Sequence, residues 1–121
     1  MNGEQKTILL VEDDTDVREY LAEVLEKGGF HVLVTPNAAA ALDLLRRGEP
    51  VDLLLTDIRM PGVNGVELSR RAAAVRPGLK MLFVSGYAGD LATGLDAARL
   101  ISKPVRPETL LRRIEEELIA L

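Results

Sequence analysis

Five short apolar runs, separated by segments of helical periodicity, constrain the fold of this chain more than any other feature. The runs are Ile8–Val11, Val32–Val34, Asp52–Thr56, Met81–Ser85 and Leu100–Ser102. Continuous apolar runs of this length are typical of strands buried on both faces. Because parallel strands need crossover connections, the alternation predicts five βα units forming one parallel sheet with helices on both faces.

The segments between the runs place apolar residues at helical spacing. The first helix is expected to end at Gly28–Gly29, the second to start behind Asn37, and the third to span Gly65–Val75. Small residues and glycines between Gly86 and Ala98 predict only a short helix, starting at Asp90. In the last helix a core-facing stripe is expected from four residues, namely Leu111, Ile114, Leu118 and Leu121.

The length and charge of the chain narrow its class. At 121 residues it fits a single domain, residues 1–121, with one core. A net charge of −4 without a basic stripe argues against direct nucleic-acid binding. The chain has no cysteine, no apolar run of membrane-spanning length and no signal peptide, so a cytoplasmic location without membrane insertion is expected.

Charged side chains follow three of the predicted strands. Glu12–Asp13–Asp14 comes after the first, Asp57 comes directly after the third, and Lys103–Pro104 follows the fifth. The carboxyl ends of parallel strands form the crevice in which open α/β sheets hold ligands. The sequence therefore predicts a site that combines clustered carboxylates with one ammonium.

Four motifs at predicted strand ends carry a resemblance to a known family: Leu10–Asp14, Thr56–Gly62 with Asn64–Gly65, Val84–Gly86 and Ser102–Pro104. Over essentially its whole length the chain resembles a receiver domain of two-component signalling, similar to the C-terminal receivers of hybrid sensor histidine kinases. The resemblance implies a flavodoxin-like, doubly wound, five-stranded parallel (βα)5 fold. It also implies acceptance of a phosphoryl group onto Asp57 from a histidine kinase or a histidine phosphotransfer protein.

The chemistry of phosphoryl transfer explains these residue types. An Asp nucleophile approaching an anionic phosphoryl group needs charge neutralisation, and Mg²⁺ prefers oxygen ligands. Asp13 and Asp57 are the expected direct ligands, with Glu12 acting through a water molecule. By resemblance, the backbone carbonyl of Arg59 is the third protein ligand. Lys103 and the Ser85 hydroxyl are expected to contact phosphoryl oxygens.

Other interpretations stay open from the sequence alone. Glu12, Asp13 and Asp14 could be solvated acidic residues in a helix first turn, and Ser85 could be structural. An Asp-nucleophile phosphatase uses similar residues, but it carries a second Asp two positions after the nucleophile, where this chain has Arg59. A non-phosphorylated interaction module is the third possibility. The leading interpretation is a phosphoacceptor domain with self-catalysed phosphotransfer and dephosphorylation rather than an enzyme.

One position departs from the family pattern. Many receivers have Tyr or Phe three residues before the conserved Lys, whereas this chain has Leu100. A switch by rotation of an aromatic ring is therefore in doubt, and phosphorylation is expected to act on the surface around residues 86–105. The only histidine, His31, is expected to be an ordinary strand-edge residue. The expected oligomeric state is a monomer or a weak dimer.

Overall fold

A computed structural model describes residues 5–86 and 97–120 of the chain. The strands are β1 (Thr7–Val11), β2 (His31–Thr35), β3 (Leu53–Asp57), β4 (Lys80–Ser85) and β5 (Leu100–Ser102). The helices are α1 (Thr15–Lys27), α2 (Ala38–Arg46), α3 (Gly65–Val75), the short 3₁₀ helix η2 (Ala97–Arg99) and α4 (Pro107–Ile119). The alternation of apolar runs therefore predicted the element types correctly.

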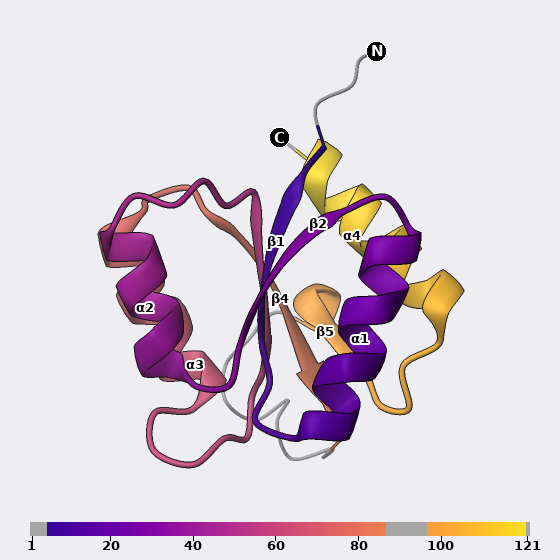
Figure 1. Cartoon of the computed structure of the whole chain (residues 1–121), viewed down its shortest axis with the longest axis horizontal. Coiled ribbons are helices and arrows are strands. Elements are labelled where there is room, and N and C mark those ends of the chain that lie inside the picture. Colours follow the sequence, from indigo (N-terminus) through magenta and orange to yellow (C-terminus); the bar gives the residue numbers. More distant parts are fainter. Residues whose placement is uncertain (1–4, 87–96, 121) are drawn as a thin grey trace.

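All five strands are parallel and form one sheet in the order β2-β1-β3-β4-β5. Helices α1 and α4 cover one face, and α2 and α3 cover the other (Figure 1). This is the flavodoxin-like doubly wound arrangement that the sequence predicted. Strand order reverses at β1, so the carboxyl ends of β1 and β3 lie side by side, with Val11 opposite Thr56.

The sheet separates two apolar cores. Ile8, Leu10, Leu53 and Leu55 face α1 and α4, whereas Leu9 and Leu54 face α2 and α3. Residues of β1 and β3 are thus buried alternately on both faces, which explains why the strands read as unbroken apolar runs. Every helix in residues 5–86 and 97–120 is too short or too polar to span a membrane.

Several predicted boundaries and faces differ from the structure. β2 and β3 each end one residue later than predicted, and Asp52 lies before β3, where its carboxylate accepts a hydrogen bond from the Thr7 backbone N–H at 2.8 Å. In α4 the fully buried residues are Leu110 and Ile114, while Leu111 and Leu118 are half-buried. Leu121 and the helix expected at Asp90 lie outside the described residues.

Three side chains start helices by capping backbone N–H groups. Asp14 accepts from Val17, Asn37 from Ala40 and Asn64 from Glu67, at 3.0, 2.8 and 2.9 Å. Each of these residues is of a type that favours the N-cap position. Asp14 is therefore occupied as the cap of α1, which leaves Glu12 and Asp13 as the acidic residues of the β1–α1 loop that are free to face the crevice.

Candidate functional site

The side chains that the sequence singled out meet at the carboxyl end of the sheet. Asp57 is the last residue of β3, and Glu12 follows directly after β1. Both carboxylates are buried, with Glu12 1% and Asp57 7% exposed. One carboxylate oxygen each from Glu12, Asp13 and Asp57 lies within 4.8 Å of the others. Buried carboxylates this close together repel one another unless a cation compensates them.

Lys103 supplies one positive charge to this cluster. Its Nζ donates a hydrogen bond to Asp57 Oδ2 at 3.0 Å and lies 3.9 Å from Glu12 Oε1. Burial lowers the pKa of Lys103, but the hydrogen bond and charge of Asp57, together with Glu12 and Asp13, outweigh it and raise that pKa. The ammonium is therefore firmly charged. The other Asp57 oxygen, Oδ1, accepts a long 3.4 Å bond from the Arg59 N–H.

Glu12 remains incompletely paired within the cluster. Its Oε2 accepts a hydrogen bond from the Asp14 N–H at 3.2 Å, whereas Oε1 is buried without a hydrogen-bond partner among the described residues. Burial raises the pKa of Glu12 to about 7, with the Asp14 N–H opposing the rise and Asp57 adding to it. A buried acceptor that lacks a donor is the feature expected beside a hydrated cation. The donor set, made of hard oxygen atoms, fits Mg²⁺.

Ser85 and Gly86 border the same cluster from β4. Val84 is the register partner of Asp57, so Ser85 lies one residue beyond it at the strand end, and it is half-buried. The backbone of Lys103 is tied to Ser85, because the Lys103 N–H donates to the Ser85 carbonyl at 2.8 Å. A Cβ at Gly86 would lie 3.4 Å from Lys103 Cδ. β4 and the β5–α4 loop thus hold Lys103 and Ser85 next to each other.

Gly65 and Arg18 support the site, although the sequence analysis assigned neither of them a chemical role. Gly65 packs so closely under the β3–α3 loop that a Cβ there would lie 2.2 Å from the Asp57 carbonyl oxygen. Arg18 donates to the Glu12 carbonyl at 2.8 Å and so holds the β1–α1 loop from α1. The Asn64–Gly65 pair is visible in the sequence, but the role of Arg18 depends on a contact that only the fold creates.

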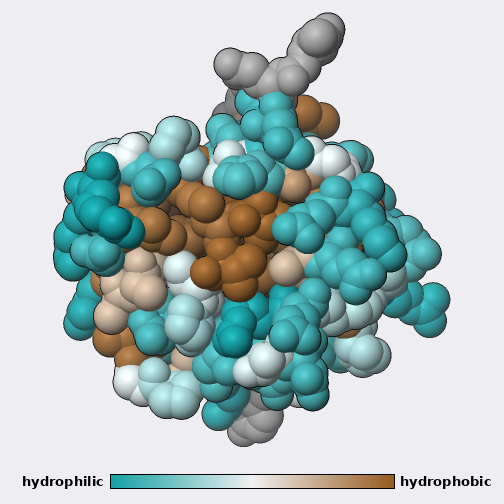
Figure 2. Space-filling model, in the orientation of Figure 1, coloured by the Kyte–Doolittle hydropathy of each residue, from teal (hydrophilic) through white to brown (hydrophobic). Residues whose placement is uncertain are grey.

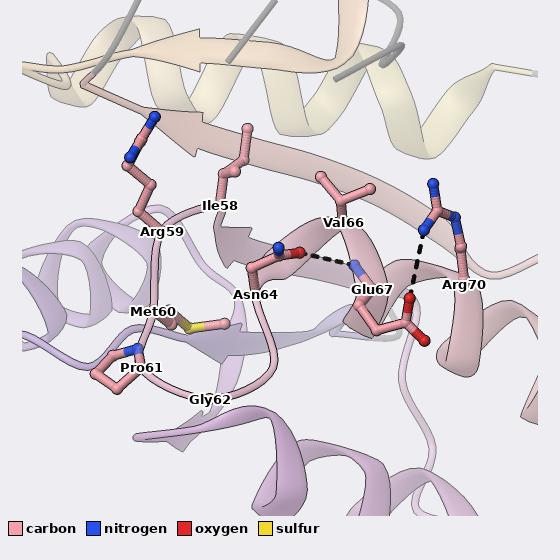
Figure 3. A pocket seen from close by; sticks show the side chains of 9 residues that line it. All are labelled: Ile58, Arg59, Met60, Pro61, Gly62, Asn64, Val66, Glu67 and Arg70. Atoms are coloured by element: carbon pink, nitrogen blue, oxygen red, sulfur yellow. Dashed lines mark hydrogen bonds and ion pairs between the residues drawn. The ribbon is translucent and has the colours of Figure 1, made fainter. Parts of the chain in front are cut away.

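The β3–α3 loop also borders a hollow of about 660 Å³ beside the cluster. Figure 3 shows its lining, with Arg59 and Arg70 at opposite ends and Glu67 joined to Arg70. The Arg70–Glu67 and Arg71–Glu67 pairs lower the pKa of Glu67, with Arg71 the larger cause. Asp57 does not line this hollow, so the charged cluster, rather than the hollow, has the groups needed for chemistry.

Comparison with known proteins decides the family. Residues 8–115 match the model of the response regulator receiver domain, which is most of the chain. The chain belongs to this receiver family. It is 46% identical over 119 residues to the response regulator receiver protein CpdR of Brucella abortus (strain 2308), covering 95% of this chain and 98% of that protein.

Other relatives of this receiver domain differ in length. It is 34% identical to the C4-dicarboxylate transport transcriptional regulatory protein DctD of Rhizobium meliloti (strain 1021), but spans only 25% of that protein. Among solved structures it is similar to a CheY-like receiver protein of Methanospirillum hungatei JF-1, with a TM-score of 0.82, 37% identity and coverage of 95% and 94% of the two chains. The receiver domain of the hybrid histidine kinase CckA gives a TM-score of 0.79 at 32% identity, with coverage of 93% and 98%.

Family membership makes this chain a receiver domain of two-component signalling. Receiver domains in general interact with histidine kinases or phosphotransfer proteins, and they bind Mg²⁺ at an acidic pocket. The cluster of Glu12, Asp13 and Asp57 is compatible with that property. The role of each residue in this chain remains a prediction.

Proposed function

We propose that this receiver domain accepts a phosphoryl group onto Asp57 from the phosphohistidine of a histidine kinase or a phosphotransfer protein, in a Mg²⁺-dependent reaction. A bond from an Asp57 oxygen to phosphorus forms as the bond from phosphorus to the donor's histidine nitrogen breaks. The observation that carries the proposal is the position of Asp57. It lies at a buried strand end within 4.8 Å of two further carboxylates and 3.0 Å from the Lys103 ammonium.

The neighbouring residues divide the remaining tasks. Asp13 and Asp57, with the backbone carbonyl of Arg59, would hold Mg²⁺ directly, and Glu12 would act through a water molecule. The bound cation would neutralise charge on the transferring phosphoryl group. Lys103 and the Ser85 hydroxyl then contact phosphoryl oxygens. Support comes from the hydrogen bond between the two backbones, which keeps these side chains adjacent.

The same site accounts for loss of the phosphoryl group. Water attacks phosphorus, and the bond from phosphorus to the Asp57 oxygen breaks to regenerate the carboxylate. No second Asp stands two positions after Asp57, since that position is Arg59. We therefore propose that residues 1–121 act as one phosphoacceptor domain with self-catalysed phosphotransfer and dephosphorylation, and do not turn over external phosphate esters.

A groove beside the site offers a docking place for the phosphodonor. It lies between α1 and the loop after β5, and its apolar walls include Val17, Tyr20 and Val105. The Tyr20 hydroxyl donates to the Val105 carbonyl at 2.9 Å, which keeps the two walls together. Lys103 lines the same groove and also contacts Asp57. A helix of the donor lying in this groove would present its phosphohistidine close to Asp57.

Chemical phosphorylation tests the proposal without the cognate kinase. Incubation of the purified chain with a small acyl phosphate and Mg²⁺ should add one phosphoryl group, detected by intact-mass spectrometry. Asp57→Asn should remove the modification, because an amide is a poor nucleophile. The matched control is Asp43→Asn, the same change at an exposed ion-paired position on α2, and it should be modified as fully as the native chain.

Two outcomes of these phosphorylation experiments would contradict the proposal. Modification that persists in Asp57→Asn would identify another acceptor. Steady release of phosphate from an added phosphate monoester, at many turnovers per chain, would favour the phosphatase over the phosphoacceptor domain.

A further inference from the structure

The free edge of the sheet at β2 is an apolar surface. Among residues 5–86 and 97–120, β2 pairs with β1 and with no other strand. Val34 is 43% exposed, and Val32 and Leu33 are half-buried. Figure 2 shows a hydrophobic area in the middle of the face that looks onto β2, between the hydrophilic surface over α1 and the mixed surface over α2. We call Val32, Leu33 and Val34, with their backbone, the β2 edge.

The β2 edge lacks the devices that usually keep an edge strand from pairing. Natural sheets protect their edges with Lys, Pro, bulges or very short strands. β2 is a continuous five-residue strand without Lys or Pro. The opposite edge strand, β5, has three residues and is therefore protected by its length. The two edges of this sheet thus differ, and only β2 presents a long apolar one.

The direction of the backbone determines which N–H and C=O groups of the β2 edge are available to pair with another strand. The His31 N–H donates to the Lys6 carbonyl, and the Thr35 carbonyl accepts from Glu12, so both residues point their backbone toward β1. Because direction alternates along a strand, the N–H and C=O groups of Val32 and Val34 point away from the sheet. The outward N–H and C=O groups of these two residues are spaced so that they can pair with the same groups of a second, antiparallel copy of β2.

We infer that a second copy of this chain pairs with the β2 edge, antiparallel and centred on Leu33, and joins the two five-stranded sheets into one. Val32 of each copy then exchanges a reciprocal pair of N–H···O=C bonds with Val34 of the other. The two Leu33 residues face each other at the central pair without hydrogen bonds. The interface is isologous, as most homodimer interfaces are.

The charges on α1 fit this arrangement. Tyr20 lies on the flank of α1 that contacts Val105, so Arg18, Ala22 and Glu26, spaced four apart, lie on the flank toward β2. The helix runs antiparallel to β2, and Ala22 stands next to its middle residue, Leu21. With Ala22 at the level of the Leu33 pair, antiparallel copies of α1 bring the exposed Glu26 of each copy opposite Arg18 of the other, whose guanidinium also holds the Glu12 carbonyl. The two small alanines then lie at the crossing.

The width of α1 is also compatible with pairing of the two β2 strands. A helix is about 10 Å wide, roughly twice the distance of about 4.8 Å between strands. Two α1 helices, each lying over its own β1 and β2, would therefore touch when the β2 strands pair. The valines beneath them would pair as β-branched cross-strand neighbours, which are favourable in sheets.

The inferred dimer leaves the phosphoacceptor site accessible. Its twofold axis is perpendicular to the sheet, so the carboxyl ends of the strands in the two copies point in opposite directions. The two Asp57 residues then lie at opposite ends of the combined sheet. The groove lined by Tyr20 and Val105 is on the other flank of α1 and also stays open.

Sedimentation analysis at chain concentrations up to about 1 mM tests this pairing. The native chain should show a concentration-dependent monomer–dimer equilibrium. Val34→Lys should raise the dissociation constant at least about tenfold, because each introduced ammonium would face the apolar Val32 of the other copy. The control is Ile119→Lys, the same charge introduced at a 79% exposed apolar residue on α4, which should leave the constant within about twofold.

A disulfide test checks the register independently of stability. The chain contains no cysteine, so any crosslink comes from the one introduced. Leu33→Cys should form a disulfide dimer under mild oxidation, because facing residues at a non-hydrogen-bonded pair lie within disulfide reach. Val34→Cys is more exposed but stands opposite Val32, and it should crosslink at least about fivefold more slowly.

Several results would overturn the inference. A monomeric native chain over the whole concentration range would do so, as would equal dissociation constants for Val34→Lys and the native chain. Equal crosslinking rates for Leu33→Cys and Val34→Cys would also reject it, even if a dimer forms elsewhere.

Discussion

At the scale of single residues, Glu12 shows how position changes an ordinary side chain. Its carboxylate is 1% exposed, and one oxygen has no hydrogen-bond donor among the described residues. Nothing in the letters Glu12–Asp13–Asp14 distinguishes a buried carboxylate from a solvated one. Burial at the strand end raises the pKa of Glu12 to about 7, well above its usual 4.5.

Glu12→Gln should flatten the pH dependence of stability in the metal-free chain. With a folded-state pKa of about 7 and an unfolded value of 4.5, the protonated form is favoured by folding. This contribution is complete below pH 4.5 and is lost as pH rises through 7. The native chain should therefore lose on the order of 2 kcal/mol from this source between pH 5 and pH 8. Urea unfolding with a chelator present measures it.

The control for this measurement is Glu26→Gln, an exposed position on α1. It leaves Glu12 unchanged and should keep the native pH dependence. If Glu12→Gln loses as much stability over this pH range as the native chain, Glu12 is not the titrating group.

At the scale of elements, α4 depends on a lysine from the neighbouring strand. Its C-terminal carbonyls at Glu117 and Leu118 accept hydrogen bonds from Lys80 Nζ at 2.8 and 3.2 Å, and the Ala120 carbonyl accepts a third. The last carbonyls of a helix lack partners within the helix and carry partial negative charge. The first residue of β4 therefore caps the C-terminal end of α4, beginning at a carbonyl 37 positions later in the chain.

Lys80→Met should lower the free energy of unfolding by about 0.5–2 kcal/mol, since the carbonyls lose a charged donor while the aliphatic stem is kept. Lys27→Met makes the same chemical change on α1, where the lysine pairs with exposed Glu23. That variant should change stability by less than about 0.5 kcal/mol. Urea denaturation of both proteins makes the comparison. Equal losses would show that Lys80 does not stabilise α4 specifically.

At the scale of the whole molecule, the doubly wound sheet brings acidic residues from two distant parts of the chain together. Glu12 and Asp13 come from the loop after β1, and Asp57 comes from β3. Folding holds these carboxylates within 4.8 Å of one another, and their repulsion opposes the native state. A ligand that binds only the folded state and relieves this repulsion stabilises the entire domain.

Mg²⁺ should therefore raise the melting temperature of the chain. At a concentration ten times the dissociation constant, the stabilisation is about 1.4 kcal/mol, which corresponds to roughly 3–6 °C for a domain of this size. Asp13→Asn should abolish most of the shift. Asp16→Asn, an acidic-to-amide change at the exposed start of α1, should preserve it. Scanning calorimetry with and without Mg²⁺ gives the answer, and an equal shift in both variants would remove Asp13 from the site.

The sequence alone determined the local features of this protein. Apolar periodicity predicted the strands and helices, and Asn37 was correctly assigned as a helix cap. The carboxyl ends of three strands could be marked as the ligand crevice because parallel crossovers bring those ends to one edge. The first and last residues of the elements were predicted less accurately than the element types. Asp52 was placed in β3, although its carboxylate is bound to the Thr7 N–H before the strand begins.

Only the tertiary structure decided how distant residues act on one another. Burial of Glu12, the support of its loop by Arg18 and the capping of α4 by Lys80 all depend on contacts between elements. Strand order likewise made β2 an edge, although its apolar residues resemble those of the central strands. The physical reason is that periodicity reports which face of an element is apolar. Whether another element covers that face, and which one, is decided by the packing of the whole sheet.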